Sequence, residues 1–138
     1  MADYIITEDN TEEVLSALER AIERGLEAIG MNAEGHAKKD PQMPVDTGRA
    51  RNSITYAMAG EEAHIKSYKG DNGEEGGTYS GTADGKRGEA VYIGSNVEYF
   101  PSIELGGRNI TARHVLQRAA SEHREEYKRL LEESMKNA

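Results

Sequence analysis

Apolar side chains recur at steps of three and four residues over the first quarter of the chain, and acidic side chains lie mostly on the other faces. This is the period of an amphipathic helix. Asn10 and Glu13 have the spacing of a capping-box pair at its start. We therefore predict a long N-terminal helix from residue 11 that turns one stripe toward the core. The stripe consists of Val14, Leu15, Leu18, Ile22, Leu26, Ile29 and Ala33.

Glycine and proline limit this helix. Gly25, Gly30 and Gly35 are each expected to cost about 1 kcal/mol relative to alanine in a helix, which weakens its C-terminal part. Pro44 fixes its own φ angle and keeps Met43 out of the helical region. The helix must therefore end before this proline.

Beyond Pro44 the apolar period changes to two. Residues 53–68 alternate on both sides of a polar turn, which predicts a β-hairpin, and residues 89–94 are predicted to form a further strand. Between them, residues 70–88 contain seven glycines and one large apolar side chain, Tyr79. Such a segment buries too little apolar surface to offset its ordering entropy, so we expect a long mobile loop.

A second helical period follows near the C-terminus. Thr111 is the expected cap, and the apolar stripe runs from Val115 to Leu131. Residues 1–10 are expected to be a flexible N-terminal arm, and residues 11–138 a single α+β domain. This domain should have a long N-terminal helix, a small antiparallel sheet of three to four strands with the glycine-rich loop, and a C-terminal helix packed on the same face.

The composition is lean in apolar residues and acidic. Of 138 residues, 36% are hydrophobic, and the chain has no Trp and one Phe, so we expect part of its stability to come from association with other copies. A formal charge of −8 is unfavourable for holding nucleic-acid phosphates, which lysine and arginine neutralise. No cysteine is present for a disulfide or a thiolate metal site. Without a signal-like N-terminus or an apolar run of about 20 residues, we expect a soluble cytoplasmic protein with no membrane partner.

No local motif predicts catalysis. The serines lie outside a Gly-x-Ser-x-Gly elbow, and the glycine-rich segment lacks the Gly-Lys-Ser/Thr of a phosphate-binding loop. The histidines do not have the four-residue spacing that places two metal ligands on one helix face; they are His36, His64, His114 and His123. We therefore expect no catalytic, cofactor-binding or metal site, and no enzyme activity.

The segment from Pro44 to Ile54 joins the first helix to the sheet. Asp46 and Thr47 can each bond nearby backbone N–H groups and so start a turn, and Gly48 permits a backbone angle that a Cβ atom disfavours. A carboxylate pair of Asp46 with Glu98 or Glu104 is conceivable. A charge-assisted bond from Asp46 to Arg49 or Arg51 is the better interpretation.

Three segments of the chain resemble the motifs of a tailed-phage family. This family comprises the neck proteins of long-tailed phages that are called tail-completion, head–tail joining or minor tail-component proteins. The first similar segment is 44–54, the second is Val91 to Gly106 with its Tyr-x-x-x-x-Glu-x-Gly run, and the third is 111–119, in which an arginine opens the last helix. The residues that carry the resemblance are Pro44, Val45, Asp46, Thr47, Gly48, Arg49, Arg51, Ser53, Gly94, Tyr99, Glu104, Gly106 and Arg113.

The chain also departs from the pattern of this family. The family usually has Leu where Ala50 stands, and an aromatic residue or a Pro-Phe pair near His114 and Val115. The glycine-rich loop at 70–88 is longer than the family requires.

The resemblance implies a structural virion protein without catalytic activity. It would form an oligomeric ring, expected to be a hexamer, that completes the tail end and joins it to the head around the DNA channel. Its partners would be other copies of itself, a head-side connector, and tail-tube or tail-terminator proteins, and DNA would pass through without being specifically bound. The protein would lie in the host cytoplasm during assembly and then in the virion neck. The acids expected at the channel or an interface are Asp71, Glu74, Glu75 and Asp84.

Two other classes of protein compete with this interpretation. A small regulatory or nucleic-acid-associated protein of a mobile element would need a basic face. The arginines and lysines after residue 108 are interleaved with glutamates, which favours a mixed solvated helix instead. A small hydrolase would need an assembled site, which no motif in the sequence indicates.

Overall fold

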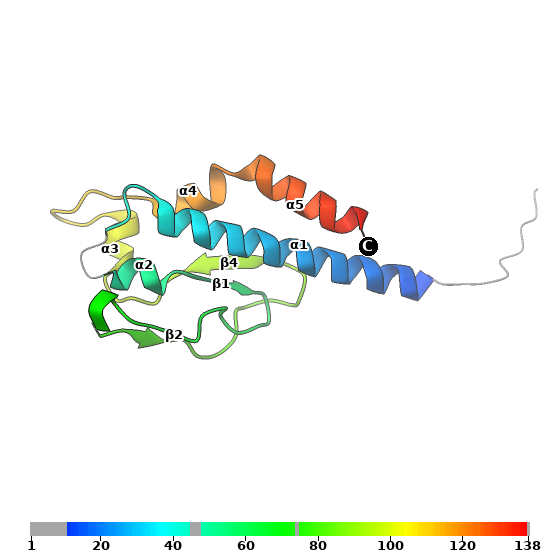
Figure 1. The fold of residues 1–138 in the computed structure, drawn as a ribbon, viewed down its shortest axis with the longest axis horizontal. Coiled ribbons are helices and arrows are strands. Elements are labelled where there is room, and N and C mark those ends of the chain that lie inside the picture. Colours follow the sequence, from blue (N-terminus) through cyan, green and yellow to red (C-terminus); the bar gives the residue numbers. More distant parts are fainter. Residues whose placement is uncertain (1–10, 45–47, 74, 138) are drawn as a thin grey trace, which may run out of the picture.

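The fold is built along one long helix (Figure 1). The computed structural model describes residues 11–44, 48–73 and 75–137. In chain order its elements are α1 (Thr11–Lys39), α2 (Arg49–Ser53), β1 (Thr55–Met58), β2 (Ser67–Tyr68), a 3-10 turn η1 (Asp71–Gly73), β3 (Gly77–Thr78), β4 (Val91–Gly94), α3 (Phe100–Leu105), α4 (Val115–Ser121) and α5 (Arg124–Lys136). The predicted α+β class is confirmed.

Helix α1 contacts most of the other elements. It packs on strands β1 and β4, and α4 also contacts β4. Figure 1 shows α5 running back along α1 in the opposite direction. Within the described residues, no helix has a stretch both long and apolar enough to cross a bilayer.

The strands form two small antiparallel sheets rather than one sheet of three to four strands. Strand β1 pairs with β4, with Thr55 opposite Gly94 and Met58 opposite Val91, and β2 pairs with β3. The predicted hairpin over 53–68 is therefore wrong, because the return segment meets β1 at a single bridge between Ala57 and Ala63. Next to this bridge the backbone of Ala83 bonds Gly60 and Glu61 instead.

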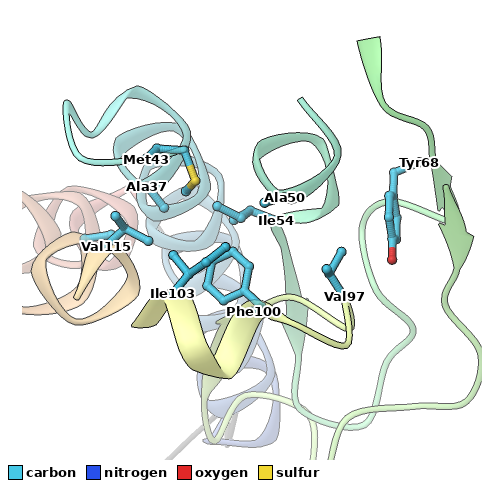
Figure 2. Packing of buried hydrophobic residues seen from close by; sticks show 10 residues of the cluster. Ala37, Met43, Ala50, Ile54, Tyr68, Val97, Phe100, Ile103 and Val115 are labelled. Atoms are coloured by element: carbon cyan, nitrogen blue, oxygen red, sulfur yellow. The ribbon is translucent and has the colours of Figure 1, made fainter. Parts of the chain in front are cut away.

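The main core lies at the C-terminal end of α1, where α2, α3 and α4 meet (Figure 2). Ile54, Val97 and Val115 are fully buried there, beside Phe100 and Ile103. These side chains come from segments that are distant in sequence, so the cluster joins the middle and the end of the chain to α1.

The predicted apolar stripe of α1 describes only part of the face that the helix buries. The buried residues are Ala21, Gly25, Gly30, Ala33 and Ala37, of which Ala33 alone belongs to the stripe, whereas Leu18, Ile22, Leu26 and Ile29 are half-buried. The side chains of Val14 and Leu15 are 58% and 52% exposed. Small residues are buried because side chains of the sheet and of α5 lie directly against the helix at Gly25 and Gly30.

Two of the helix glycines lie at these close approaches. A Cβ atom on Gly30 would lie 2.6 Å from Cδ2 of Tyr56 and 2.8 Å from Cγ2 of Val91. A Cβ atom on Gly25 would lie 2.7 Å from Cδ1 of Leu131. The contacts with the sheet and with α5 therefore depend on the missing side chains at these two positions.

The predicted C-terminal helix is divided in two. Residues 111–114 are not helical, because the N–H groups of Arg113 and His114 donate to the carbonyls of Ile103 (2.8 Å) and Glu104 (3.2 Å). Helix α4 therefore starts four residues after Thr111 and ends at Ser121. The hydroxyl of Tyr127 donates to the carbonyl of Ala119, which satisfies an acceptor at the break before α5.

We predict that alanine substitutions will separate packing from helix propensity in α1. Gly35→Ala should raise the free energy of unfolding by up to about 1 kcal/mol, because a Cβ atom there meets nothing within 4 Å. Gly30→Ala should lower it by about 1–3 kcal/mol despite the same gain in propensity, because the core is overpacked. Urea unfolding followed by circular dichroism measures both, and equal stabilisation by the two substitutions would contradict the packing.

Candidate functional site: a polar junction of three segments

The three segments that resemble the phage family meet at one end of the molecule. Ile54 belongs to the first segment, Val97, Phe100 and Ile103 to the second, and Val115 to the third, and all five lie in the core of Figure 2. Around this core the same segments place a network of charged and polar side chains.

Helix α2 is joined to η1 through Asp71. The Arg51 guanidinium donates to both carboxylate oxygens of Asp71 (3.1 and 3.0 Å), and the Asn52 amide donates to Asp71 (3.2 Å) and to the Lys69 carbonyl (2.9 Å). Gly48 has a φ of 76° and lies so close to Asp71 that a Cβ atom would overlap its carboxylate. The first segment thus needs glycine for its conformation and for this contact.

Arg49 projects from the same helix toward the second segment. Its guanidinium forms a bidentate pair with Glu98 (3.0 and 3.2 Å) and lies 5.7 Å from the centre of the Tyr99 ring. Hydrogen bonds from its own backbone N–H and from Arg49 hold the pKa of the Glu98 carboxyl below its usual value. This pair fixes α2 against the start of α3.

Hydroxyl groups connect the first segment to the turn after β4. Ser53 and Ser95 share a hydrogen bond of 2.6 Å, and the Tyr79 hydroxyl donates to the Ser53 carbonyl. The Asn96 N–H donates back to the Tyr79 oxygen (3.1 Å), while the Tyr68 hydroxyl donates to the Asn96 side chain (2.6 Å). Burial raises the pKa of Tyr79, so its phenol stays protonated as this network requires.

Glu104, the glutamate of the second family-like segment, caps helix α4. Its two carboxylate oxygens accept the N–H groups of Leu116 (2.8 Å) and Gln117 (2.9 Å) in the first turn of α4. A carboxylate at a helix N-terminus satisfies free donors and complements the helix dipole. Two residues later Gly106 has a φ of 81°, and a Cβ atom there would lie 2.9 Å from the Ile110 carbonyl oxygen.

The third segment is tied to the end of α1. Arg113 donates to the Gln42 carbonyl (3.0 Å), and Arg118 forms a bidentate pair with Asp40, with both N–O distances 2.9 Å. Burial alone would raise the pKa of the Asp40 carboxyl, but hydrogen bonds from Arg118 and from the Gln42 backbone hold it below its usual value. The sequence pattern predicts a solvated helix face for Arg118, whereas the structure pairs it with Asp40.

Three large apolar side chains at this end face solvent. Tyr99 is 38% exposed, Leu105 72% and Ile110 51%. The backbones of Gly107 and Ile110 bond each other (2.9 and 3.3 Å) and close a tight turn. Figure 1 shows the segment after α3 projecting beyond the body of the molecule. Ile110 lies on this turn and Leu105 ends the helix before it, and exposed apolar side chains at a projecting turn are typical of a contact surface for another protein.

The remaining predicted site residues fall into three groups. Val45, Asp46, Thr47 and Glu74 lie outside the described residues, so the predicted bond of Asp46 to an arginine is not tested. Asp71 is not a free acid of the loop, because it is paired with Arg51. Glu75 and Asp84 are exposed on the loop.

The glycine-rich segment has more structure than its composition suggested. It contains η1 and β3, the latter paired with β2, and its backbone bonds Gly60 and Glu61 through Ala83. Its mobility stays a prediction. Beside it lies an open pocket of about 270 Å³ between Thr55, Tyr79 and Tyr92, and the described residues that line it bring no carboxylate, imidazole or amine.

Comparison of the chain with family models, curated proteins and solved structures gives no match.

We predict that Asp40→Asn will destabilise the protein in a pH-dependent manner. The folded-state pKa of Asp40 is lowered from 3.8, so its contribution to stability is fully present above the unfolded value of 3.8 and is lost as the pH falls from there through the folded pKa. At pH 7 the substitution should cost about 1 kcal/mol. Urea unfolding at pH 7, 5 and 3 should show the difference from wild type shrinking only below about pH 4.

Asp84→Asn serves as the control, because it makes the same change of side chain at an exposed position. This substitution should leave the unfolding midpoint within about 0.5 kcal/mol of wild type. A cost of Asp40→Asn that stays constant from pH 7 to pH 3 would contradict a role for the ionised carboxylate.

Proposed function

We propose that the protein is a structural subunit of a long-tailed phage neck, which forms a ring that completes the tail end and joins it to the head. The observation that supports this most is the meeting of the three family-like segments around one core and one polar network. A resemblance carried by residues in the same order along the sequence is stronger evidence when those residues also contact one another in the structure. Gly48, Ser53, Glu104 and Gly106 each have a structural reason in that network.

The arrangement suits a protein whose role is to contact other proteins. The charged and polar bonds of the junction hold α2, α3 and the turn at 107–110 in place. The backbone that carries the exposed Leu105 and Ile110 is therefore fixed, and these two side chains would bury apolar area when another copy covers them. We assign this end to contacts between subunits of the ring, which we propose to be a hexamer.

The other proposed partners are those of a neck protein. A head-side connector would bind one side of the ring, and tail-tube or tail-terminator proteins would bind the other. Double-stranded DNA would pass through the centre without specific binding. The subunit would assemble in the host cytoplasm and then remain in the virion.

The acidic charge is consistent with a passage for DNA. A charge of −8 on each subunit repels a polyanion over a screening length of about 8 Å at physiological salt. Since Asp71 is engaged by Arg51, the acids proposed for the channel reduce to Glu75 and Asp84, together with Glu74.

A nucleic-acid-binding role is less well supported. It would need a basic face, whereas Arg49, Arg87 and Arg118 are paired with carboxylates and Arg113 donates to a carbonyl. The exposed basic residues of α5 are interleaved with glutamates. Arginines that are neutralised within the chain displace few counterions from DNA.

We predict that charges introduced into the exposed apolar surface will prevent ring formation. The double substitution Leu105→Glu and Ile110→Glu should give a folded monomer where the wild type forms a closed oligomer, because glutamate resists desolvation at an interface. Light scattering coupled to size-exclusion chromatography measures the mass, and negative-stain electron microscopy shows the ring.

The matched control is Met31→Glu, which changes another apolar side chain, 53% exposed on α1, and should leave the ring intact. Circular dichroism verifies that each variant is folded. A wild type that stays monomeric at every accessible concentration, or a ring that survives the double substitution, would contradict the proposal.

A further inference from the structure

Two histidines and a glutamate meet where the end of α1 crosses the start of α5. His36 Nε2 lies 2.9 Å from Glu126 Oε2, and His123 Nδ1 lies 3.7 Å from the same oxygen. The rings of His36 and His123 are stacked, with centroids 3.5 Å apart and planes within 4° of parallel. Residues 87 positions apart in the sequence thus bring three metal-ligating groups together, which no local spacing could reveal.

The local fold positions each of the three side chains. His123 lies in the break between α4 and α5 and precedes the first residue of α5, while Glu126 follows three residues later on the first turn. Side chains three apart on a helix share a face. His36 comes from the last turns of α1, which packs against α5.

The three ligand atoms lie within 4.8 Å of one another. Atoms that bind one zinc ion tetrahedrally at about 2.1 Å are about 3.4 Å apart. The bonded pair His36–Glu126 is already closer than this, so rotation of the His123 ring and a small outward shift of the carboxylate would admit an ion.

The surroundings of the cluster suit a metal ion, for which neutral imidazole is the binding form. Tyr127 borders the cluster with its ring centre 6.3 and 6.1 Å from those of the two histidines, and its hydroxyl is held by Ala119. The three side chains are 30–33% exposed, which leaves access for an ion and for water.

We infer that His36, His123 and Glu126 bind a divalent transition-metal ion, with water in the remaining position. Two imidazoles and one carboxylate form a donor set typical of zinc, and oxygen-seeking Mg²⁺ and Ca²⁺ fit it poorly. The ion would connect α5 to α1 across the break in the C-terminal helix. This inference does not depend on the proposed neck function.

Titration calorimetry of tag-free, chelator-stripped protein with ZnCl₂ at pH 7.5 tests the site. We expect one zinc per chain and a melting temperature that rises with zinc concentration. His36→Ala and Glu126→Gln should each weaken zinc binding by at least about tenfold. MgCl₂ at the same concentrations should neither bind nor raise the melting temperature.

Two control substitutions are available in the same chain. His64→Ala removes a histidine that is paired with Glu34 elsewhere on the surface, and Glu125→Gln changes the exposed neighbour of Glu126. Both should bind zinc as the wild type does. Since His36→Ala could unfold the chain, imidazole NMR of the wild type gives an independent measurement. Zinc should shift the ring signals of His36 and His123 and leave those of His64 and His114 in place.

Absence of zinc binding to the wild type would overturn the inference. So would equal affinity in Glu126→Gln, or ring shifts at His64 rather than at His36 and His123. In each of these cases the three side chains would only stabilise the contact between α1 and α5 through hydrogen bonds.

Discussion

The close approach of α1 to the sheet at Gly30 is the constraint on which the rest of the structure depends. Among the residues that the structure describes, the sheet of β1 and β4 has two strands, and a pair of strands is marginally stable in water without a covering element. Gly30 lets the Tyr56 ring and Val91 lie directly against the helix backbone, and Gly25 does the same for Leu131 of α5. The two glycines therefore lower the helix propensity of α1 but allow close packing against the sheet and against α5.

At the C-terminal end of α1, the polar junction fixes the positions of α2, α3 and α4. Asp40 and Arg118 tie the end of α1 to α4, Glu104 caps α4, and Arg49 holds α2 to Glu98. Charge-assisted, bidentate geometry restricts orientation more than an apolar contact does. Leu105 and Ile110 are thereby presented on a fixed support, which lowers the entropic cost of covering them.

The sequence predicted what depends on local pattern. The period of the first helix, its end before Pro44 and the strand near residue 91 follow from short-range sterics and alternation, and the helix and strand are present as expected. It misplaced the partner of β1, because pairing is decided by tertiary contacts and not by the alternation of residues 53–68. It also missed the pair of Asp40 with Arg118 and the contact of His36 with His123 and Glu126, since Asp40 and Arg118 are 78 positions apart and His36 and Glu126 are 90 apart. The glycines of α1 were interpreted as weaknesses because propensity contains no information about a close neighbour.

The central claim is that the end of the molecule bearing Tyr99, Leu105 and Ile110 is covered by another copy of the chain. Hydrogen exchange measured by mass spectrometry over a range of protein concentrations tests it most directly. Backbone amides between residues 104 and 112 should become protected as the concentration rises, while those in the middle of α1 stay equally slow throughout. Exchange of residues 104–112 that is fast and independent of concentration, in a sample whose mass shows an oligomer, would contradict the account.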